Sequence, residues 1–175
     1  MPAIPPESPS MDARMLRIWR DMLFSHSAIV QKLGDDLSEQ AGLTLAQYDV
    51  LLKLLECPED AMRMGELAED VLVTTSGLTR VVDKLETAGL VTRVRVSSDR
   101  RGVLVSLTDA GRAKLSEASK IHLDGIRRNF SRYIAEDELP VLERFFRRLF
   151  SEVRNSPVVE DLPTPTLPPR DAGTH

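Results

Sequence analysis

A change of periodicity between Met64 and Leu107 constrains the fold of this chain more than any other feature. Apolar residues first recur at three- and four-residue steps, which predicts two short helices. These residues are Leu67, Ala68, Val71 and Leu72 in the first segment, and Leu78, Val81, Val82 and Leu85 in the second. Gly89 ends the second segment, because glycine adopts the left-handed conformation after a helix without a Cβ penalty.

After Gly89 the apolar residues alternate, which predicts two strands joined by a polar turn over residues 97–102. One face of the first strand carries Leu90, Thr92, Val94 and Val96. Its other face carries Arg93 and Arg95, which we expect to be solvated. One face of the second strand carries Val103, Val105 and Leu107. Helix, turn, helix and hairpin together are the outline of a winged helix-turn-helix, a unit that reads DNA.

The charge of this region supports that interpretation, although the whole chain is acidic. The net charge is −4 and the pI is about 5.5, which alone would argue against a nucleic-acid partner. Residues 74–101, however, contain six cations and three anions, a local excess of +3. Because local distribution governs contact with phosphates, the winged unit is the expected nucleic-acid surface.

Composition also limits the compartment in which the chain works. A single cysteine excludes an intrachain disulfide and fits a reducing environment. No apolar run reaches the roughly 18 residues of a membrane span. The N-terminal segment PAIPPESPS lacks the basic and apolar regions of a signal peptide. We therefore expect a cytoplasmic protein with no membrane partner.

The sequence before the winged unit predicts a disordered tail followed by two helices. Residues 1–10 are proline-rich, and a long helix follows from about Asp12 to Gln40. Thr44 and Gln47 form a capping box that begins the second helix. Cys57 ends it, because the residue before a proline avoids the helical region.

The sequence after the winged unit predicts two more helices and a second disordered tail. Thr108 is the expected N-cap of a helix that runs to about Ile134. The final helix is expected from about Glu136 to Val153, with three acidic residues in its first turn. Its apolar residues are too many and too large for an isolated helix, so they need a partner surface. Residues 154–175 contain PTPTLPP and are expected to be disordered.

Three segments in this order resemble the MarR family of bacterial transcriptional regulators. They are LTLAQYDVLLKL, MGELAEDVLVTTSGLTRVVDKLETAGLVTR and SSDRRGVLVSLTDAGR. The most specific part is Asp99-x-Arg101 followed by the strand and LTDAG, and the resemblance covers residues 11–153. It implies a mostly α fold with a small β-hairpin wing, six helices and a homodimer. Residues 11–42 and 108–153 would form the dimerisation helices, and residues 43–107 the winged helix-turn-helix.

The resemblance also implies a DNA-binding surface. The second helix of the motif would enter the major groove, where Arg80 can pair with guanine. The wing tip would meet the minor groove, with Arg101 inserted and Asp99 holding its guanidinium. The DNA-facing residues would be Thr75, Ser76, Thr79, Arg80, Lys84, Arg93, Arg95, Ser98, Asp99, Arg100 and Arg101. The plainer alternatives are helix capping by Thr74 or Thr75 and a simple hairpin ion pair between Asp99 and Arg101.

Two further surfaces follow from the resemblance. Similar proteins bind aromatic or phenolic acids in a crevice between the dimerisation helices and the winged unit. The expected ligand residues are Trp19, Arg20, His26 and Tyr48, although Trp19 and His26 also suit a hydrophobic core. The expected dimerisation residues are Ile126, Phe130, Phe145, Phe146, Leu149 and Phe150. The predicted function is a DNA-binding repressor that a small molecule releases.

Other functions find less support in the sequence. The chain has no glycine-rich phosphate loop and no HExxH motif, so we expect no catalytic residue and no cofactor. His26, His122 and Cys57 lack the paired spacing of a zinc site, so a metal-responsive regulator is a minor alternative. Cys57 ends the second helix, whereas oxidant-sensing relatives carry a cysteine near the start of the first, so a structural thiol is the expectation. A winged helix used only for protein interaction is the remaining alternative.

Overall fold

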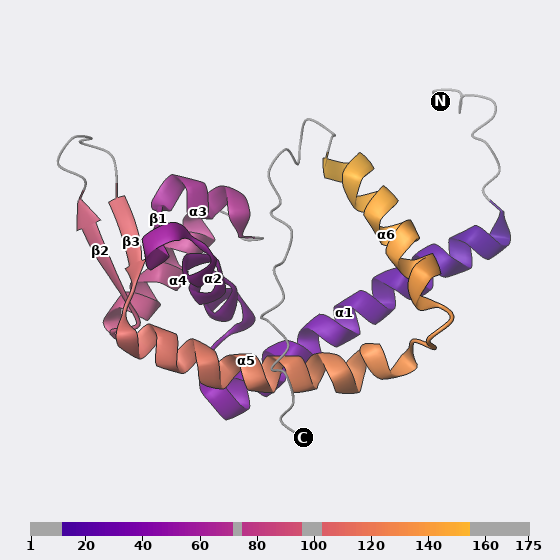
Figure 1. Cartoon of the computed structure of the whole chain (residues 1–175), viewed down its shortest axis with the longest axis horizontal. Helices are drawn as coiled ribbons and strands as arrows, with labels where there is room; N and C mark the ends of the chain where they lie inside the picture. The colour runs from indigo at the N-terminus through magenta and orange to yellow at the C-terminus, as the bar shows by residue number, and fades with distance from the viewer. Residues whose placement is uncertain (1–11, 72–74, 96–102, 155–175) are drawn as a thin grey trace, which may run out of the picture.

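The computed structural model describes residues 12–71, 75–95 and 103–154. Its elements are α1 (Ala13–Ala41), α2 (Leu45–Glu56), η1 (Pro58–Asp60), β1 (Ala61–Arg63), α3 (Met64–Asp70), α4 (Thr75–Thr87), β2 (Val91–Arg95), β3 (Val103–Leu107), α5 (Asp109–Asn129), η2 (Ser131–Tyr133) and α6 (Leu139–Arg154). The predicted fold class, mostly helical with a small sheet, is confirmed (Figure 1). The two predicted tails and the wing tip lie outside the described residues.

The sheet has one strand more than the predicted hairpin. Its three antiparallel strands lie in the order β1-β3-β2, so β3 pairs with both neighbours. Val91 and Val105 are buried against the core, whereas Val94 on the opposite face of β2 is 55% exposed. Side chains of β2 alternate as predicted, but the predicted orientation of the strand is wrong, because the face with Val91 and Arg93 is turned inward and the face with Thr92 and Val94 is exposed.

Local capping explains where two of the helices begin. The Thr44 hydroxyl accepts a hydrogen bond from the Gln47 amide at 3.2 Å, and the Thr44 amide donates to Gln47 Oε1 at 2.9 Å. This confirms the predicted capping box. Thr108 caps α5 in the same manner, because its Oγ1 accepts from the Gly111 amide at 3.0 Å.

The hydrophobic core gathers around α2. It joins the C-terminal end of α1 to α3, α4, the sheet and the first half of α5. The fully buried side chains are Leu37, Leu51, Leu54, Leu67, Leu78, Leu85, Leu115, Val50, Val82, Val91 and Val105. Helices α1 and α5 also pack side by side below this core (Figure 1). The core therefore fixes the winged unit to the N-terminal half of α5.

The predicted bounds of the last two helices are wrong. Helix α5 ends at Asn129 rather than Ile134, because Phe130 leaves the helical region at φ −134° and ψ −68°. Helix α6 begins at Leu139 rather than Glu136. The Glu138 carboxylate accepts from the Ala135 amide at 2.8 Å, and Pro140 lies in the first turn, where a helix needs no amide donor.

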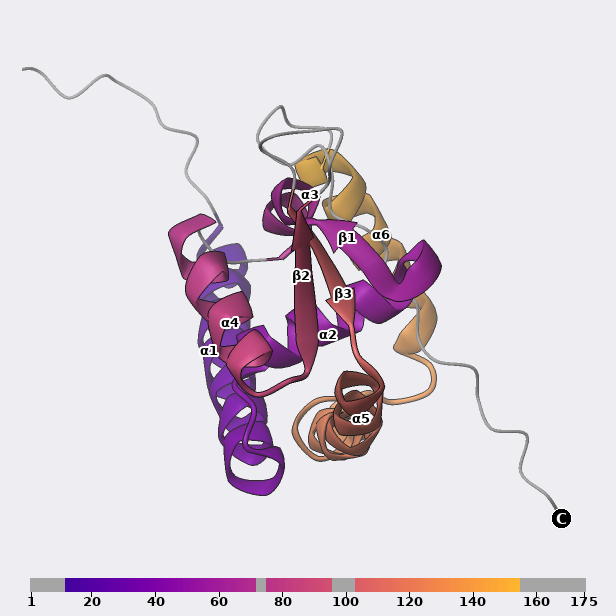
Figure 2. The same ribbon diagram turned by 90° about the vertical axis from the view of Figure 1, so that its left-hand side faces the viewer.

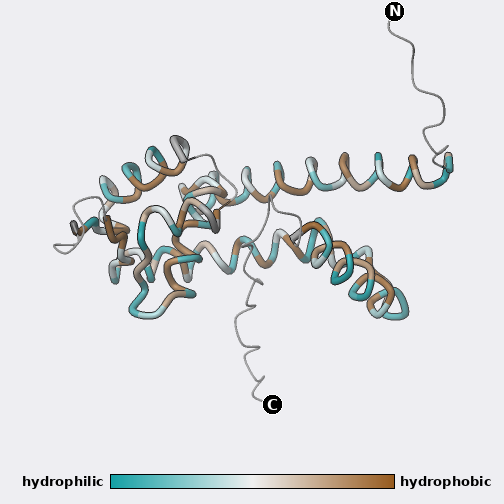
Figure 3. Tube along the Cα trace, turned by 90° about the horizontal axis from the view of Figure 1, so that it is seen from above, coloured by the Kyte–Doolittle hydropathy of each residue, from teal (hydrophilic) through white to brown (hydrophobic). Residues whose placement is uncertain are grey.

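The N-terminal part of α1 and the whole of α6 pack little against the other described residues. From Ala13 to Lys32, α1 has no buried residue, and α6 makes only marginal contact with the other elements. Figure 3 shows α1 extending away from the rest of the chain toward its N-terminus, with α6 angled apart from it. Within the described ranges, no helix combines the length and the apolar character needed to cross a membrane.

Candidate nucleic-acid interface

Helix α4 separates a buried face from an exposed polar face. Leu78, Val82 and Leu85 are completely buried and hold the helix on the core. Thr79, Arg80, Asp83, Lys84 and Glu86 are exposed, on the side away from those leucines and valine. Figure 2 shows α4 running beside the sheet, with β2 packed against it. This arrangement presents one polar face of a firmly anchored helix to solvent, as a major-groove reader requires.

Two cations on this face are free to meet an external anion. Arg80 and Lys84 lie one helical turn apart, and neither forms an ion pair among the described residues. An exposed, unpaired guanidinium can bind a guanine edge or a phosphate in bidentate fashion, and an ammonium can bind a phosphate. The structure thus brings the two predicted residues together on the expected face.

Arg93 differs from the prediction that it is a solvated strand residue. Its side chain is only 23% exposed, and it reaches from β2 to α4. The guanidinium donates to Asp83 Oδ1 at 2.5 Å, to Glu86 Oε2 at 3.3 Å and to the Thr79 carbonyl oxygen at 3.3 Å. The expected solvated side chain is therefore wrong. Spacing in the sequence did not reveal this contact, because it joins residues ten positions apart across a helix and a strand.

The other predicted DNA residues are placed only in part. Thr75 and Ser76 form the first turn of α4, and Arg95 ends β2. The backbone positions of Thr75 and Ser76 agree with the predicted start of the recognition helix. Residues 96–102 lie outside the described residues, and so does Thr74. The DNA contacts expected for Ser98, Asp99, Arg100 and Arg101 therefore stay predictions.

The predicted ligand residues do not meet within one chain. Trp19 is 53% exposed, and Arg20 and His26 are exposed on the same unpartnered half of α1. Tyr48 is 4% exposed in the core. Trp19 precedes the buried end of α1 at Leu37 by 18 residues, which corresponds to about 27 Å of helix. The described residues of a single chain therefore do not form the expected crevice.

Tyr48 instead belongs to a small aromatic cluster that the sequence did not reveal. Its ring lies 4.6 Å from that of His122 on α5, and its hydroxyl lies 3.5 Å from the Ser119 hydroxyl. His122 Nδ1 is buried and has no hydrogen-bond partner among the described residues. Burial raises the pKa of Tyr48 and lowers the pKa of His122, since it disfavours both charged forms.

Asp49, the neighbour of Tyr48, is a second perturbed group. Burial raises the pKa of the Asp49 carboxyl to about 6, and the positive charge of Lys53 opposes that shift. The Lys53 ammonium is shared, because it also binds Glu56 at 2.9 Å. Asp49 is therefore partly protonated near pH 6, and its ionisation destabilises the folded chain.

The residues considered for a metal or oxidant sensor are dispersed. Cys57 is the half-buried C-cap of α2, while His26 lies on the exposed half of α1. Across residues 12–71, 75–95 and 103–154, no three His, Cys, Asp or Glu side chains gather into a metal-binding group. The metal-sensor alternative has no site in this part of the chain.

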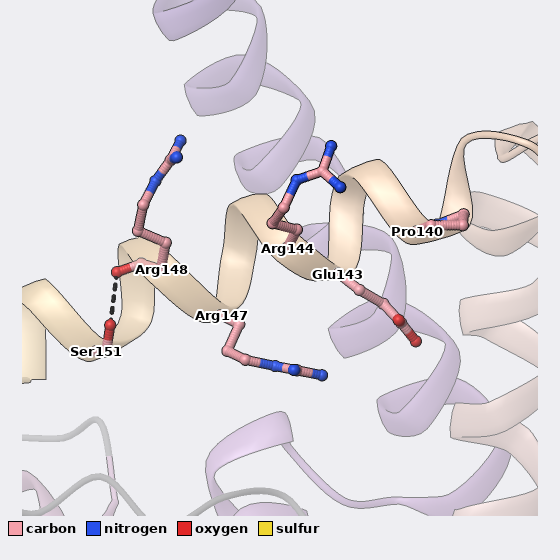
Figure 4. Close-up of a pocket in the computed structure, with 6 residues that line it drawn as sticks. All are labelled: Pro140, Glu143, Arg144, Arg147, Arg148 and Ser151. Carbon is pink, nitrogen blue, oxygen red and sulfur yellow. Dashed lines mark hydrogen bonds between the residues drawn. The ribbon is translucent and has the colours of Figure 1, made fainter.

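Helix α6 carries most of the predicted dimerisation residues, and they are exposed. Phe145, Phe146, Leu149 and Phe150 are all more than a third exposed, as is Phe130 before η2, while Ile126 is half-buried. A hollow beside α6 is lined by residues of this helix alone, from Pro140 to Ser151 (Figure 4). Arg144 and Arg148 project to one side of the helix, and Arg147 to the other. A hollow formed by one helix is an open surface, not an enclosed ligand site.

Comparison with known proteins agrees with this geometry. Residues 32–118 match the family model described as transcriptional regulator SarA/Rot. The HTH-type transcriptional repressor MdtR of Bacillus subtilis is 31% identical over 122 residues, which cover 68% of this chain and 75% of MdtR. The sequence signal and the fold therefore point to the same class of protein, a winged-helix transcriptional regulator.

Solved structures define the class more closely. Sco3205 from Streptomyces coelicolor, a MarR family transcriptional regulator solved in complex with DNA, has a TM-score of 0.78 and 28% identity, over 87% of this chain and 95% of its own. AbsC, a MarR family transcriptional regulator from the same organism, has a TM-score of 0.76 and 28% identity, over 85% of this chain and 100% of its own. The chain belongs to the MarR family of winged-helix transcriptional regulators.

Proposed function

We propose that this regulator binds a palindromic operator as a homodimer and acts as a repressor. The observation that carries the proposal is the exposed face of α4, where Arg80 and Lys84 have no ion-pair partner among the described residues. The helix is anchored through its opposite face, so its depth on the core is set before DNA arrives. Support also comes from Sco3205, which was solved with DNA, and from MdtR, which is named a repressor.

The proposed contacts divide into base readout and backbone contact. Arg80 and Thr79 would read base edges, together with Thr75 and Ser76 in the first turn of α4. Lys84 would neutralise a phosphate. In the wing, Arg101 would enter the minor groove with Asp99 holding it, and Ser98, Arg100 and Arg95 would contact the backbone.

The dimer part of the proposal rests on unsatisfied apolar surface. The first half of α1 exposes Met15, Leu16, Ile18, Trp19, Leu23 and Phe24. Helix α6 exposes a stripe of phenylalanine and leucine and hardly contacts its own chain. Exposed apolar surface of this extent marks an association site. A second copy offers matching apolar stripes, and two recognition helices about 34 Å apart would fit successive major grooves.

The effector part of the proposal is a small aromatic or phenolic ligand that releases the operator. In the proposed dimer, helices of the second copy would complete a crevice around Trp19, Arg20 and His26. Such a ligand weakens DNA binding only if it favours a dimer whose recognition helices are wrongly spaced. A screen of aromatic carboxylates and phenols should find compounds that quench Trp19 fluorescence and release DNA, and His26→Ala should blunt this response. If no compound does either, the protein is a constitutive DNA binder.

The decisive experiment selects duplexes from a random-sequence library with the wild-type protein. An enriched inverted repeat is expected, with binding that weakens steeply as salt rises. Arg80→Ala should reduce affinity for the selected duplex by about 1–3 kcal/mol and relax base preference at one symmetric pair of positions. Arg127→Ala is the matched control, because this exposed arginine lies on α5 and pairs with Asp124. Failure to enrich any duplex would support the protein-interaction alternative.

A further inference from the structure

We infer that Arg93 is a positioning residue for the recognition helix, which acts on DNA through α4 rather than by contacting a phosphate. The inference rests on the proposed function, because it concerns how the DNA-binding face is held. Its basis is the three-way contact of one guanidinium with the Asp83 and Glu86 carboxylates and the Thr79 carbonyl oxygen.

The geometry of these partners explains why the contact can orient a helix. Thr79, Asp83 and Glu86 are spaced by four and three residues, so they form one row along α4. The three residues that this single guanidinium contacts extend over nearly two turns of the helix. The planar fork of arginine suits such multiple contacts, whereas a lysine ammonium would act as a point charge. The row is thereby tied to one position on β2.

The contact between Arg93 and α4 can restrain the helix because β2, which carries Arg93, is itself held rigidly. Arg93 lies opposite Val105 of the central strand β3, which is completely buried. The strand cannot shift without disturbing the core beneath it. Core contacts through Leu78, Val82 and Leu85 fix the depth of α4, but an apolar face alone permits some rotation and sliding of the helix. A directional ion-pair network at the opposite edge restricts that motion.

The same contact removes Arg93 from the set of cations that are available to DNA. Its side chain is 23% exposed, whereas those of Asp83 and Glu86 are 53% and 42% exposed. Two carboxylates already neutralise the guanidinium, so a phosphate would have to displace them. Arg80 and Lys84 face no such competition among the described residues. The free charge of α4 therefore lies on the flank away from Arg93.

A double-mutant cycle separates positioning from phosphate contact. The variants are Asp83→Asn, Arg93→Gln and the double variant, tested on the selected duplex and on a scrambled duplex of equal length. Positioning predicts that Arg93→Gln weakens binding to the selected duplex about tenfold and Asp83→Asn about threefold, with the double variant no worse than Arg93→Gln alone. Weaker binding by Asp83→Asn is the telling sign, since removing an acidic group near phosphates would by itself tighten binding.

Specificity distinguishes positioning from a loss of folded protein. A misplaced α4 lowers the preference for the selected over the scrambled duplex, whereas a smaller folded fraction lowers both affinities equally. Thermal unfolding of each variant establishes that the assays run well below the melting temperature. Arg127→Gln, which breaks the exposed pair with Asp124 on α5, should leave the preference unchanged.

Three results overturn the inference. The first is tighter binding by Asp83→Asn together with additive effects in the double variant, which would make Arg93 a phosphate contact. The second is a fall of about 0.9 in the salt slope for Arg93→Gln with specificity intact. The third is a wild-type protein that enriches no duplex, which would remove the proposed function and this inference with it.

Discussion

Gly111 offers the sharpest test of how the winged unit is joined to α5. A Cβ atom at this position would lie 2.1 Å from the Leu90 carbonyl oxygen and 2.8 Å from Leu107 Cδ1. An ordinary carbon–oxygen contact is about 3.3 Å. Gly111→Ala therefore forces the α5 N-terminus and the α4–β2 loop to move apart by about 1 Å. Neither neighbour can yield easily, because one is backbone and the other is buried in the core.

The expected loss of stability can be estimated from these contacts. Overpacking of a tight site costs about 3 kcal/mol. Thr108 donates to the Leu90 carbonyl oxygen through its amide at 3.1 Å and its hydroxyl at 3.0 Å, and weakening these bonds costs about another 1 kcal/mol. Alanine returns about 0.5–1 kcal/mol through its higher helix propensity. Gly111→Ala should therefore reduce the free energy of unfolding by about 3 kcal/mol.

Urea denaturation at fixed protein concentration measures this change. With a denaturant slope of about 2 kcal/mol/M, the midpoint should fall by about 1.5 M. Gly34→Ala is the matched control, because a Cβ there meets no atom within 4 Å and Gly34 lies inside α1. That variant should gain about 0.5–1 kcal/mol. If Gly111→Ala unfolds within 0.5 M of the wild-type midpoint, the described join between α5 and Leu90 is wrong.

Two further predictions concern pH and assembly. Because burial raises the pKa of Asp49 to about 6, the folded chain holds this proton more tightly than the unfolded chain, and stability is lost as pH rises from about 4 through 6. The free energy of unfolding of Asp49→Asn should therefore exceed that of the wild type by about 3 kcal/mol at pH 7.5, and the difference should vanish near pH 4. A variant as stable as the wild type at both pH values would contradict the raised pKa of Asp49. Phe146→Glu should shift the protein from dimer to monomer in sedimentation at micromolar concentration, whereas a variant that stays dimeric would exclude this surface from the interface.

Local signals in the sequence predicted much of the fold. Thr44 with Gln47 and Thr108 with Gly111 mark helix starts through contacts three residues apart, so they can be identified without tertiary structure. The periodicity of Leu78, Val82 and Leu85 likewise identified the buried face of α4. Strand β1 was missed because three residues are too few for a periodic pattern, and its pairing with β3 spans about forty positions.

The site was less predictable than the fold, because its decisive contacts are not local. Arg93 has the same sequence context as an ordinary solvated strand residue, and only the packing angle between α4 and β2 brings it onto Asp83. Trp19 lies on an apolar stripe in the sequence, which does not reveal that its side chain is half exposed on α1. The pairing of Tyr48 with His122 joins residues on α2 and α5 that no spacing rule connects. Residue type indicated the chemistry at these positions, but tertiary packing determined the partners.

The most direct test of the proposed function is the stoichiometry and footprint of the wild-type protein on its selected duplex. Analytical ultracentrifugation of the complex counts the chains bound, and hydroxyl-radical footprinting maps the protected backbone. A dimeric reader of DNA should give two chains per duplex and two protected half-sites on one face of the DNA, with centres about 10 base pairs apart. One chain per duplex, or protection without a repeat of this spacing, would contradict a dimer that reads DNA through paired α4 helices.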